Sequence, residues 1–268
     1  MINRLLKTIF LFFMTVFILT GCQRKQKNEL DVLAREPNLA TINVQSDYAA
    51  EVIESSGGLD AWIRTLKLQF NCVVTFYRPD GSLYLTEQQF TVYPWSNSVE
   101  IFGQEPDNTF AWRLSQGRFE VLQGKGHIIN SKNVVDNQCY AETIKDIITA
   151  PVRLLDQSVE FTKVNNPIKI QGQWYGPIVR NTKTSIESIL RIPKAVFYQN
   201  KDRLLIDMIW IACPARSQFL IVRGYDYHKI EENGLTIPNR IEIYSTDSEG
   251  DLQERLVKID LSYVEHSL

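Results

Sequence analysis

Histidines and carboxylates are the side chains of this sequence that could carry acid–base or metal chemistry. The three histidines are His127, His228 and His266. None of them lies in a nucleophile elbow, an HExxH pattern or a pair with metal-ligand spacing. Gly124-Lys125-Gly126 lacks the spacing of a phosphate-binding loop, and no spacing singles out two carboxylates for paired-acid catalysis. The sequence therefore predicts no catalytic residue, cofactor or metal site, and a hydrolase is kept only as a second alternative.

Cysteine chemistry is the other option, because the chain has four cysteines. Cys72 falls in an alternating strand pattern and is expected to be a small buried residue. Cys139 opens a predicted helix and Cys213 lies in a Cys-Pro turn. A disulfide could join these two in an oxidising compartment, although spacing alone does not decide the pairing. No pair of cysteines has metal-ligand spacing.

The fourth cysteine, Cys22, ends a segment with the order of a secretory signal. Arg4 and Lys7 precede an apolar run over residues 8–19, which is too short for a bilayer that needs about 20 apolar residues. The tetrad Leu19-Thr20-Gly21-Cys22 resembles a bacterial lipobox. That resemblance implies removal of residues 1–21 and attachment of acyl chains such as palmitate to Cys22, which would anchor the protein to a membrane. An ordinary signal peptide is the alternative.

The residues after Cys22 suggest the membrane in which the protein resides and a tether between the anchor and the domain. Gln23 follows the cysteine, and in Gram-negative sorting the lack of an aspartate there favours the outer membrane, with the protein facing the periplasm. Residues 22–45 are polar and show no sustained apolar pattern. They are expected to form a tether, which as a flexible coil would span roughly 25 Å.

Length and composition allow one large β domain or two small ones, and we expect a single β-rich domain over residues 46–268. Without residues 1–21 the chain carries 27 basic and 31 acidic side chains, a balance that gives no electrostatic case for nucleic acid. Hydrophobic residues make up 44% of the sequence and aromatic residues 11%, enough for a substantial core.

Most of this domain reads as antiparallel strands, since alternating runs follow one another with turn residues between them. The run over residues 203–211 is apolar on both faces and should be covered on both, with Ile206, Met208 and Trp210 expected on one face and Ile209 and Ile211 on the other. The predicted strands cover residues 68–77, 83–93, 98–102, 109–115, 118–122, 159–163, 168–175, 195–198, 203–211, 218–227, 236–245 and a last strand through residues 257–263.

Helices are expected at two places. Ser46 could cap a helix to residue 55, and after Gly57-Gly58 a second helix would place Leu59, Trp62, Ile63 and Leu66 on one face. A later helix should start at Asp136 or Asn137, with Pro151 kinking or splitting it. Its apolar stripe is predicted to contain Tyr140, Ile144, Ile147, Ile148, Val152 and Leu155.

Two short motifs in this arrangement resemble the LolA/LolB lipoprotein-carrier superfamily. One is Gly57-Gly58-Leu59-Asp60-Ala61-Trp62 at a helix start, and the other is Asn233-Gly234-Leu235-Thr236-Ile237-Pro238 at a strand entry. The resemblance spans most of residues 46–265. It implies a mainly β (α+β) fold, an unclosed antiparallel half-barrel of roughly eleven strands with short lid helices around an apolar cavity.

The resemblance also implies a function, the non-catalytic binding of a lipid or another hydrophobic ligand. The expected cavity-lining residues are Trp62, Phe70, Phe76, Phe90, Met208, Trp210, Ile241 and Ile243. The expected partners are a membrane, through the acyl chains on Cys22, and a lipid or acylated ligand. The alternative is an envelope structural or protein-interaction lipoprotein with a filled core, whose partner would bind exposed Trp95, Trp112 and Trp174.

Overall fold

The computed structural model describes residues 33–34, 37, 46–105, 108–124, 135–156, 159–181, 195–213, 218–247 and 250–267. Its contacts divide the chain into two compact units, Met1–Arg35 and Glu36–Leu268. Every element named below belongs to the second unit. The predicted signal segment, Cys22 and the predicted tether lie outside the described residues, apart from residues 33, 34 and 37.

One antiparallel sheet dominates this unit, and the described residues contribute 13 strands to it. The strands are β1 (Lys67–Tyr77), β2 (Leu83–Tyr93), β3 (Ser98–Glu105), β4 (Asn108–Ser115), β5 (Arg118–Gln123), β6 (Glu160–Lys163), β7 (Ile168–Ile170), β8 (Gln173–Asn181), β9 (Ala195–Asn200), β10 (Ile206–Cys213), β11 (Gln218–Lys229), β12 (Thr236–Thr246) and β13 (Leu252–Ser267).

The sheet is open, and this agrees with the unclosed half-barrel that the resemblance implied. Its strand order is β5-β4-β3-β2-β1-β13-β12-β11-β10-β9-β8-β6, with β7 paired to β8, so β5 and β6 are its edges. The expected number of about eleven strands is corrected to 13. One cause is the predicted strand over residues 168–175, which breaks at Gln171 and Gly172, both with positive φ, into β7 and β8.

Three helices accompany the sheet in the described residues, α2 (Asp47–Ser55), α3 (Leu59–Arg64) and α4 (Asn137–Arg153). The N-cap of α2 is Ser46, as predicted, although its side chain makes no capping hydrogen bond. The prediction for the next helix was too long, because α3 ends at Arg64 and leaves Leu66 outside. Pro151 does not split α4, which continues for two residues beyond it.

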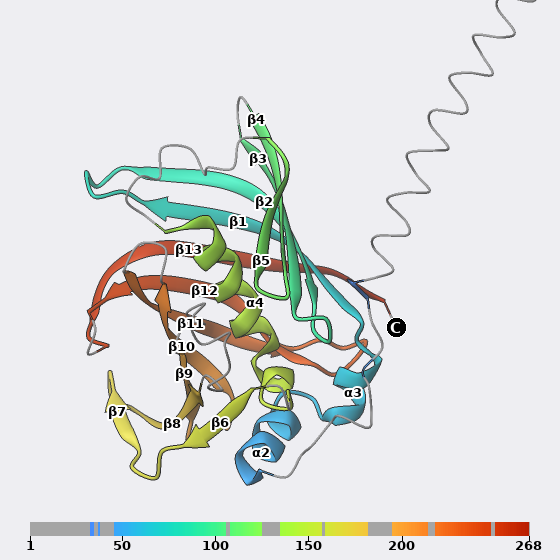
Figure 1. Ribbon diagram of the computed structural model, residues 1–268, viewed down its shortest axis with the longest axis vertical. Helices are drawn as coiled ribbons and strands as arrows, with labels where there is room; N and C mark the ends of the chain where they lie inside the picture. The colour runs from blue at the N-terminus through green and yellow to red at the C-terminus, as the bar shows by residue number, and fades with distance from the viewer. Residues whose placement is uncertain are drawn as a thin grey trace, which may run out of the picture. The chain divides into compact units, whose positions relative to one another are not determined.

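The position of α4 explains why the sheet must curve. This helix contacts β2, β3 and β4 on one side of the central β1–β13 pair and β10, β11 and β12 on the other side. Strands so far apart in the order can reach one helix only if the sheet bends around it. Figure 1 shows α4 between these two halves. We call the face that meets α4 the inner face and the opposite one the outer face.

The two faces carry separate apolar clusters. The main core lies on the inner face, whereas Tyr175, Met208 and Ile221 form a small second cluster. Strand β10 is therefore covered on both sides, as predicted. The predicted assignment of Ile206 to the face of Met208 is wrong, because a register shift between these residues moves Ile206 into the main core.

The two motifs that carried the family resemblance meet in space. The Thr236 amide donates to the Ser56 carbonyl over 2.9 Å. Gly57 has φ +120°, and a Cβ placed on it would lie 2.6 Å from the Gly234 carbonyl oxygen. Only glycine allows this backbone to approach so closely with that φ. The turn between α2 and α3 is thereby fixed to the start of β12.

Candidate functional site

The candidate site is the inner face of the sheet together with the side of α4 that covers it. Strands from both halves contribute large apolar side chains to this wall, including Phe76 and Phe90 from one half and Ile241 and Ile243 from the other. Each of these four residues is 2% exposed or less.

Tyr140 is the residue through which α4 meets the aromatic part of the wall. Its ring centroid lies 6.0 Å from that of Phe76 and 6.4 Å from that of Phe90. Its hydroxyl donates to Gln88 Oε1 over 3.0 Å, and Gln88 donates in turn to Thr86. Burial raises the pKa of Tyr140, so the phenol stays protonated and keeps this hydrogen bond. One polar chain therefore links α4 to β2 inside an otherwise apolar region.

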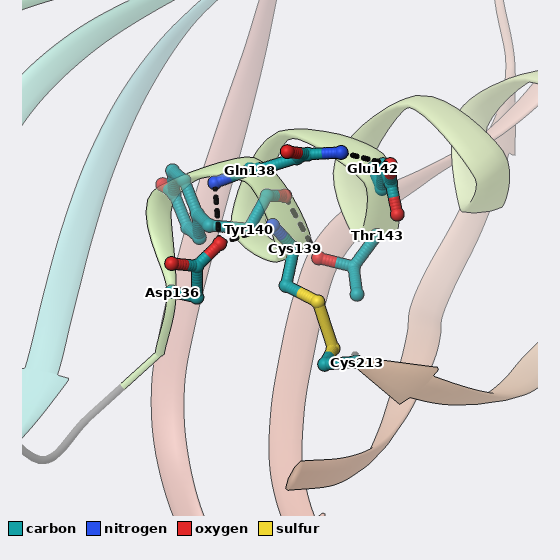
Figure 2. The surroundings of a disulfide bond; sticks show 7 residues. All are labelled: Asp136, Gln138, Cys139, Tyr140, Glu142, Thr143 and Cys213. Carbon is teal, nitrogen blue, oxygen red and sulfur yellow. Dashed lines mark hydrogen bonds between the residues drawn. A yellow bond between two sulfur atoms is a disulfide. The ribbon is translucent and has the colours of Figure 1, made fainter. Parts of the chain in front are cut away.

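A disulfide attaches the first turn of α4, next to Tyr140, to the end of β10. Cys139 on α4 is bonded to Cys213 at the end of β10, and both residues are buried (Figure 2). The pairing of Cys139 with Cys213, which the sequence alone could not decide, is present in the structure. The Asp136 carboxylate caps the helix by accepting from the amides of Gln138 and Cys139 over 3.0 and 3.2 Å. The start of α4 is attached to β2 and β10 at once.

Buried charges attach the middle of α4. Lys145 Nζ donates to Asn97 Oδ1 over 2.6 Å and lies 3.0 Å from Asp146 Oδ1. Arg180 of β8 lies 3.2 Å from the other oxygen of Asp146. We call Asn97, Lys145, Asp146 and Arg180 the charge cluster. Because Asn97 precedes β3 and Arg180 lies near the other edge, the charge cluster joins the two halves through α4.

No residue of the charge cluster is among the site residues predicted from the sequence. Lys145 and Asp146 lie between the apolar residues Ile144 and Ile147, where a polar pair normally marks the solvent face of an amphipathic helix. Instead α4 is buried almost all round, and Glu142 is the one residue between Cys139 and Arg153 that is not buried. A charged pair within a long apolar stripe was the only available signal.

Comparison with solved structures identifies the fold. A LolA superfamily protein from Nitrosomonas europaea matches with a TM-score of 0.50 at 14% sequence identity, over 82% of this chain and 93% of that chain. This chain has a LolA-like fold. The resemblance drawn from the two motifs is confirmed at the level of the fold.

Two further structures match over similar lengths with lower TM-scores. One is a DUF1329 family protein from Desulfovibrio piger, with a TM-score of 0.44, 13% identity, and coverage of 85% of this chain and 92% of that chain. The other is an outer membrane lipoprotein-sorting protein domain from Vibrio parahaemolyticus, with a TM-score of 0.41, 9% identity, and coverage of 80% and 93%. No family model and no curated protein matches the sequence.

Six of the eight predicted lining residues lie together in the LolA-like domain. Trp62, Phe70, Phe76, Phe90, Ile241 and Ile243 all belong to the main core. Met208 and Trp210 do not join them, because they belong to the cluster that contains Tyr175 and Ile221. The structure thus separates the predicted set into an inner group of six and an outer pair.

Of the three tryptophans predicted to form an exposed partner surface, two are not exposed. Trp112 is only 1% exposed and packs in the main core, where its ring stacks on Phe110. Trp95 is half-buried and donates to the Trp62 carbonyl over 2.9 Å. Trp174 alone of the three is exposed, at 49%.

The remaining chemistry-bearing residues give no site in the described part of the chain. His228 is half-buried on β11, while His127 and the side chain of His266 lie outside what the structure describes. Among the described residues no three His, Cys, Asp or Glu side chains come close enough to hold a metal ion. No described helix has the length and hydropathy needed to cross a bilayer.

The charge cluster predicts a pH dependence of stability in the LolA-like domain. Burial alone would raise the pKa of Asp146, but Lys145, Arg180 and Arg153 outweigh it and lower this pKa to about 2. A group whose pKa is lower in the folded than in the unfolded state stabilises the fold at pH values above its unfolded pKa. That contribution is lost as the pH falls toward the folded value. We expect Asp146→Asn to lower the free energy of unfolding by about 3 kcal/mol near neutral pH, because it leaves buried cations unpaired.

Urea unfolding of both proteins between neutral pH and about pH 2 measures this effect. The gap between the wild type and Asp146→Asn should close at the acid end, where Asp146 itself becomes protonated. Asp251→Asn is the control, because Asp251 is exposed and should give no gap at any pH. A constant gap for Asp146→Asn would show that its charge does not act as described.

Proposed function

We propose that this chain is a cell-envelope lipoprotein that binds a lipid or another hydrophobic ligand on its inner face without catalysing a reaction. Cys22 would hold it on a membrane, most simply the outer membrane with the domain facing the periplasm. One observation carries the proposal: an unclosed sheet has an apolar inner face, and the helix α4 covers it across both halves of the sheet.

In this proposal α4 acts as a lid whose apolar side chains hold the place of the ligand. Ile144, Ile147 and Ile148 of α4 belong to the same core as the wall residues. An acyl chain that replaced them would exchange one apolar contact for another, at about 0.8 kcal/mol per methylene on each side. The small net difference makes an exchange between closed and loaded states feasible.

A second candidate function is an envelope interaction protein with a permanently filled core. The observation that favours it is the complete burial of the wall, since Phe90, Ile241 and Ile243 are each 0% exposed under α4. In this alternative α4 never leaves the sheet, and any partner binds outside. The two functions differ in one measurable property, which is the uptake of an acyl chain.

Narrowing the inner face should weaken acyl-chain binding. Ile243→Phe adds bulk to the wall and would displace about two methylenes of a bound chain. At about 0.8 kcal/mol per methylene we expect a loss of roughly tenfold in affinity. The measurement is a titration of the Cys22→Ser protein with a fluorescent fatty acid.

Ile221→Phe is the matched control. Ile221 is 1% exposed in a neighbouring strand, but it belongs to the outer cluster. The same change there should cost similar stability through overpacking and leave affinity for the fatty acid unchanged. Equal losses in the two variants would argue against an inner-face site, and an absence of binding in the unsubstituted protein would favour the filled-core alternative.

A further inference from the structure

The polar chain of Thr86, Gln88 and Tyr140 interrupts the wall that the function proposed above assigns to an acyl chain. The three side chains are 4%, 4% and 0% exposed. Gln88 meets α4 on the inner face of β2, since its side chain binds the Tyr140 hydroxyl. A wall that bound only hydrocarbon would gain nothing from a buried carboxamide, because such a group must find hydrogen-bond partners.

The bond to Thr86 fixes which end of the Gln88 amide faces the helix. Gln88 Nε2 donates to Thr86 Oγ1 over 2.9 Å, and both residues belong to β2. This bond does not involve α4, so a movement of the helix leaves it intact. The other end of the amide, Oε1, accepts from the Tyr140 hydroxyl over 3.0 Å. The group that β2 presents to the lid is therefore an acceptor that needs a donor.

Lifting α4 from the sheet removes that donor. Tyr140 leaves with the helix, whereas Gln88 stays in the wall and is covered by the ligand instead of by water. A saturated alkyl chain has no hydrogen-bond donor, so it leaves Oε1 buried and unpaired, and this lowers the affinity. A ligand with a hydroxyl or an amide N–H at this point takes the place of the Tyr140 hydroxyl.

The polarity of β2 indicates where in the ligand this donor lies. Val92 and Phe90 are fully buried on the inner face of β2 and pair with apolar residues of β1, so they suit a hydrocarbon tail. Gln88 and Thr86 come next on the same face, toward the turn that joins β1 to β2. A ligand that follows the strand passes from apolar to polar surroundings at Gln88. Its donor therefore belongs near its polar head.

We propose that Gln88 is a specificity-determining residue that selects acyl chains with a hydrogen-bond donor close to the head group, either a hydroxyl or an amide N–H. Its Oε1 accepts from Tyr140 in the closed state and from the ligand in the loaded state. This inference rests on the proposed function, because it requires a ligand on the inner face. It goes further by naming the class of ligand.

Competition against a fluorescent fatty acid on the Cys22→Ser protein tests this selection. The probes are myristic acid, β-hydroxymyristic acid and N-myristoylglycine, which share one acyl chain and differ in the donor near the head. We expect at least one donor-bearing probe to bind roughly tenfold more tightly than myristic acid, which is about 1.4 kcal/mol. Preference for the hydroxy acid assigns the donor to a hydroxyl, and preference for the glycine conjugate assigns it to an amide N–H.

The readout is a ratio of affinities measured in one protein, so a loss of stability does not by itself change it. Gln88→Leu removes the acceptor and should abolish the preference. Gln89→Leu is the matched control, because this neighbour points to the outer face, where it donates to Asn71 over 3.3 Å. The same change there should leave the preference unchanged.

Tyr140→Phe tests the exchange of donors separately. It keeps the ring against Phe76 and Phe90 but removes the hydroxyl with which the ligand competes. Because the closed state then lacks the bond to Gln88, all three probes should bind several-fold more tightly, with the preference retained. A preference that disappears in Tyr140→Phe would contradict the exchange.

The inference is overturned if the three probes bind the Cys22→Ser protein alike, or if the preference survives in Gln88→Leu. Equal binding of all three probes would leave the proposed function intact and reject only the role of Gln88. If no fatty acid binds, the proposed function fails and the inference fails with it.

Discussion

Gly57→Ala is expected to lower the free energy of unfolding by about 4 kcal/mol or more, because it combines a backbone clash with backbone strain. The Cβ would lie 2.6 Å from the Gly234 carbonyl oxygen and 2.9 Å from Leu235 Cα, both of which are backbone atoms. A φ of +120° adds strain for any L-residue with a side chain. Either the α2–α3 turn or the start of β12 must move. Urea unfolding followed by tryptophan fluorescence measures the cost.

Gly58→Ala separates the contact from the strain. Gly58 lies in the same turn with φ +87°, and the nearest atom to an added Cβ is a flexible Glu54 carboxylate oxygen at 3.9 Å. This variant should lose about 1 kcal/mol through backbone strain alone. If the two alanine variants prove equally destabilised, the packing of the turn on Gly234 and Leu235 does not stabilise the fold as we describe.

Removal of the disulfide is expected to have the second large effect. Cys139 and Cys213 are 74 residues apart, and a loop of that length predicts a stabilisation of about 4 kcal/mol from restriction of the unfolded chain. The double variant Cys139→Ala with Cys213→Ala should show this loss in urea. It should also release the start of α4 from β10, which in the lid proposal speeds the uptake of acyl chains.

Reductant supplies the internal control. It should lower the stability of the wild type to that of the double variant and leave the double variant unchanged. Cys72 is 4% exposed, and burial raises the pKa of its thiol, so it should not react with alkylating reagents in the native state. A wild type that is indifferent to reductant would contradict the presence of the disulfide.

The fold could be predicted from the sequence where the pattern is local. Strand β2 has the predicted bounds, and the stripe from Tyr140 to Leu155 faces the main core as expected. The two glycine-containing motifs pointed to the right fold, and at Gly57 the close contact and the φ of +120° require glycine. In the structure they contact each other, at Gly57 and Gly234.

The predictions failed where the deciding interaction is long-range. A register shift in β10 separates Ile206 from Met208 and places Met208 and Trp210 on the outer face, and no pattern in the run signals it. The burial of Lys145 and Asp146 on α4 depends on Asn97 and Arg180, which come from distant elements to pair with them. Trp112 looked like a surface residue because its place in the core depends on the same curvature.

The attachments of α4 are the point on which the proposed function depends. The disulfide and the Tyr140–Gln88 hydrogen bond hold its start, and the charge cluster holds its middle. A lid pivoting about its disulfide would have to break the other two attachments. The filled-core alternative requires that they never break.

Native mass spectrometry of the Cys22→Ser protein, which cannot carry its own acyl anchor at that position, tests this choice most directly. We predict a stoichiometric, non-covalent lipid adduct, either after purification or after incubation with envelope lipids, and its extraction would identify the ligand class. A mass that stays at that of the bare polypeptide after the incubation would contradict acyl-chain binding at the inner face.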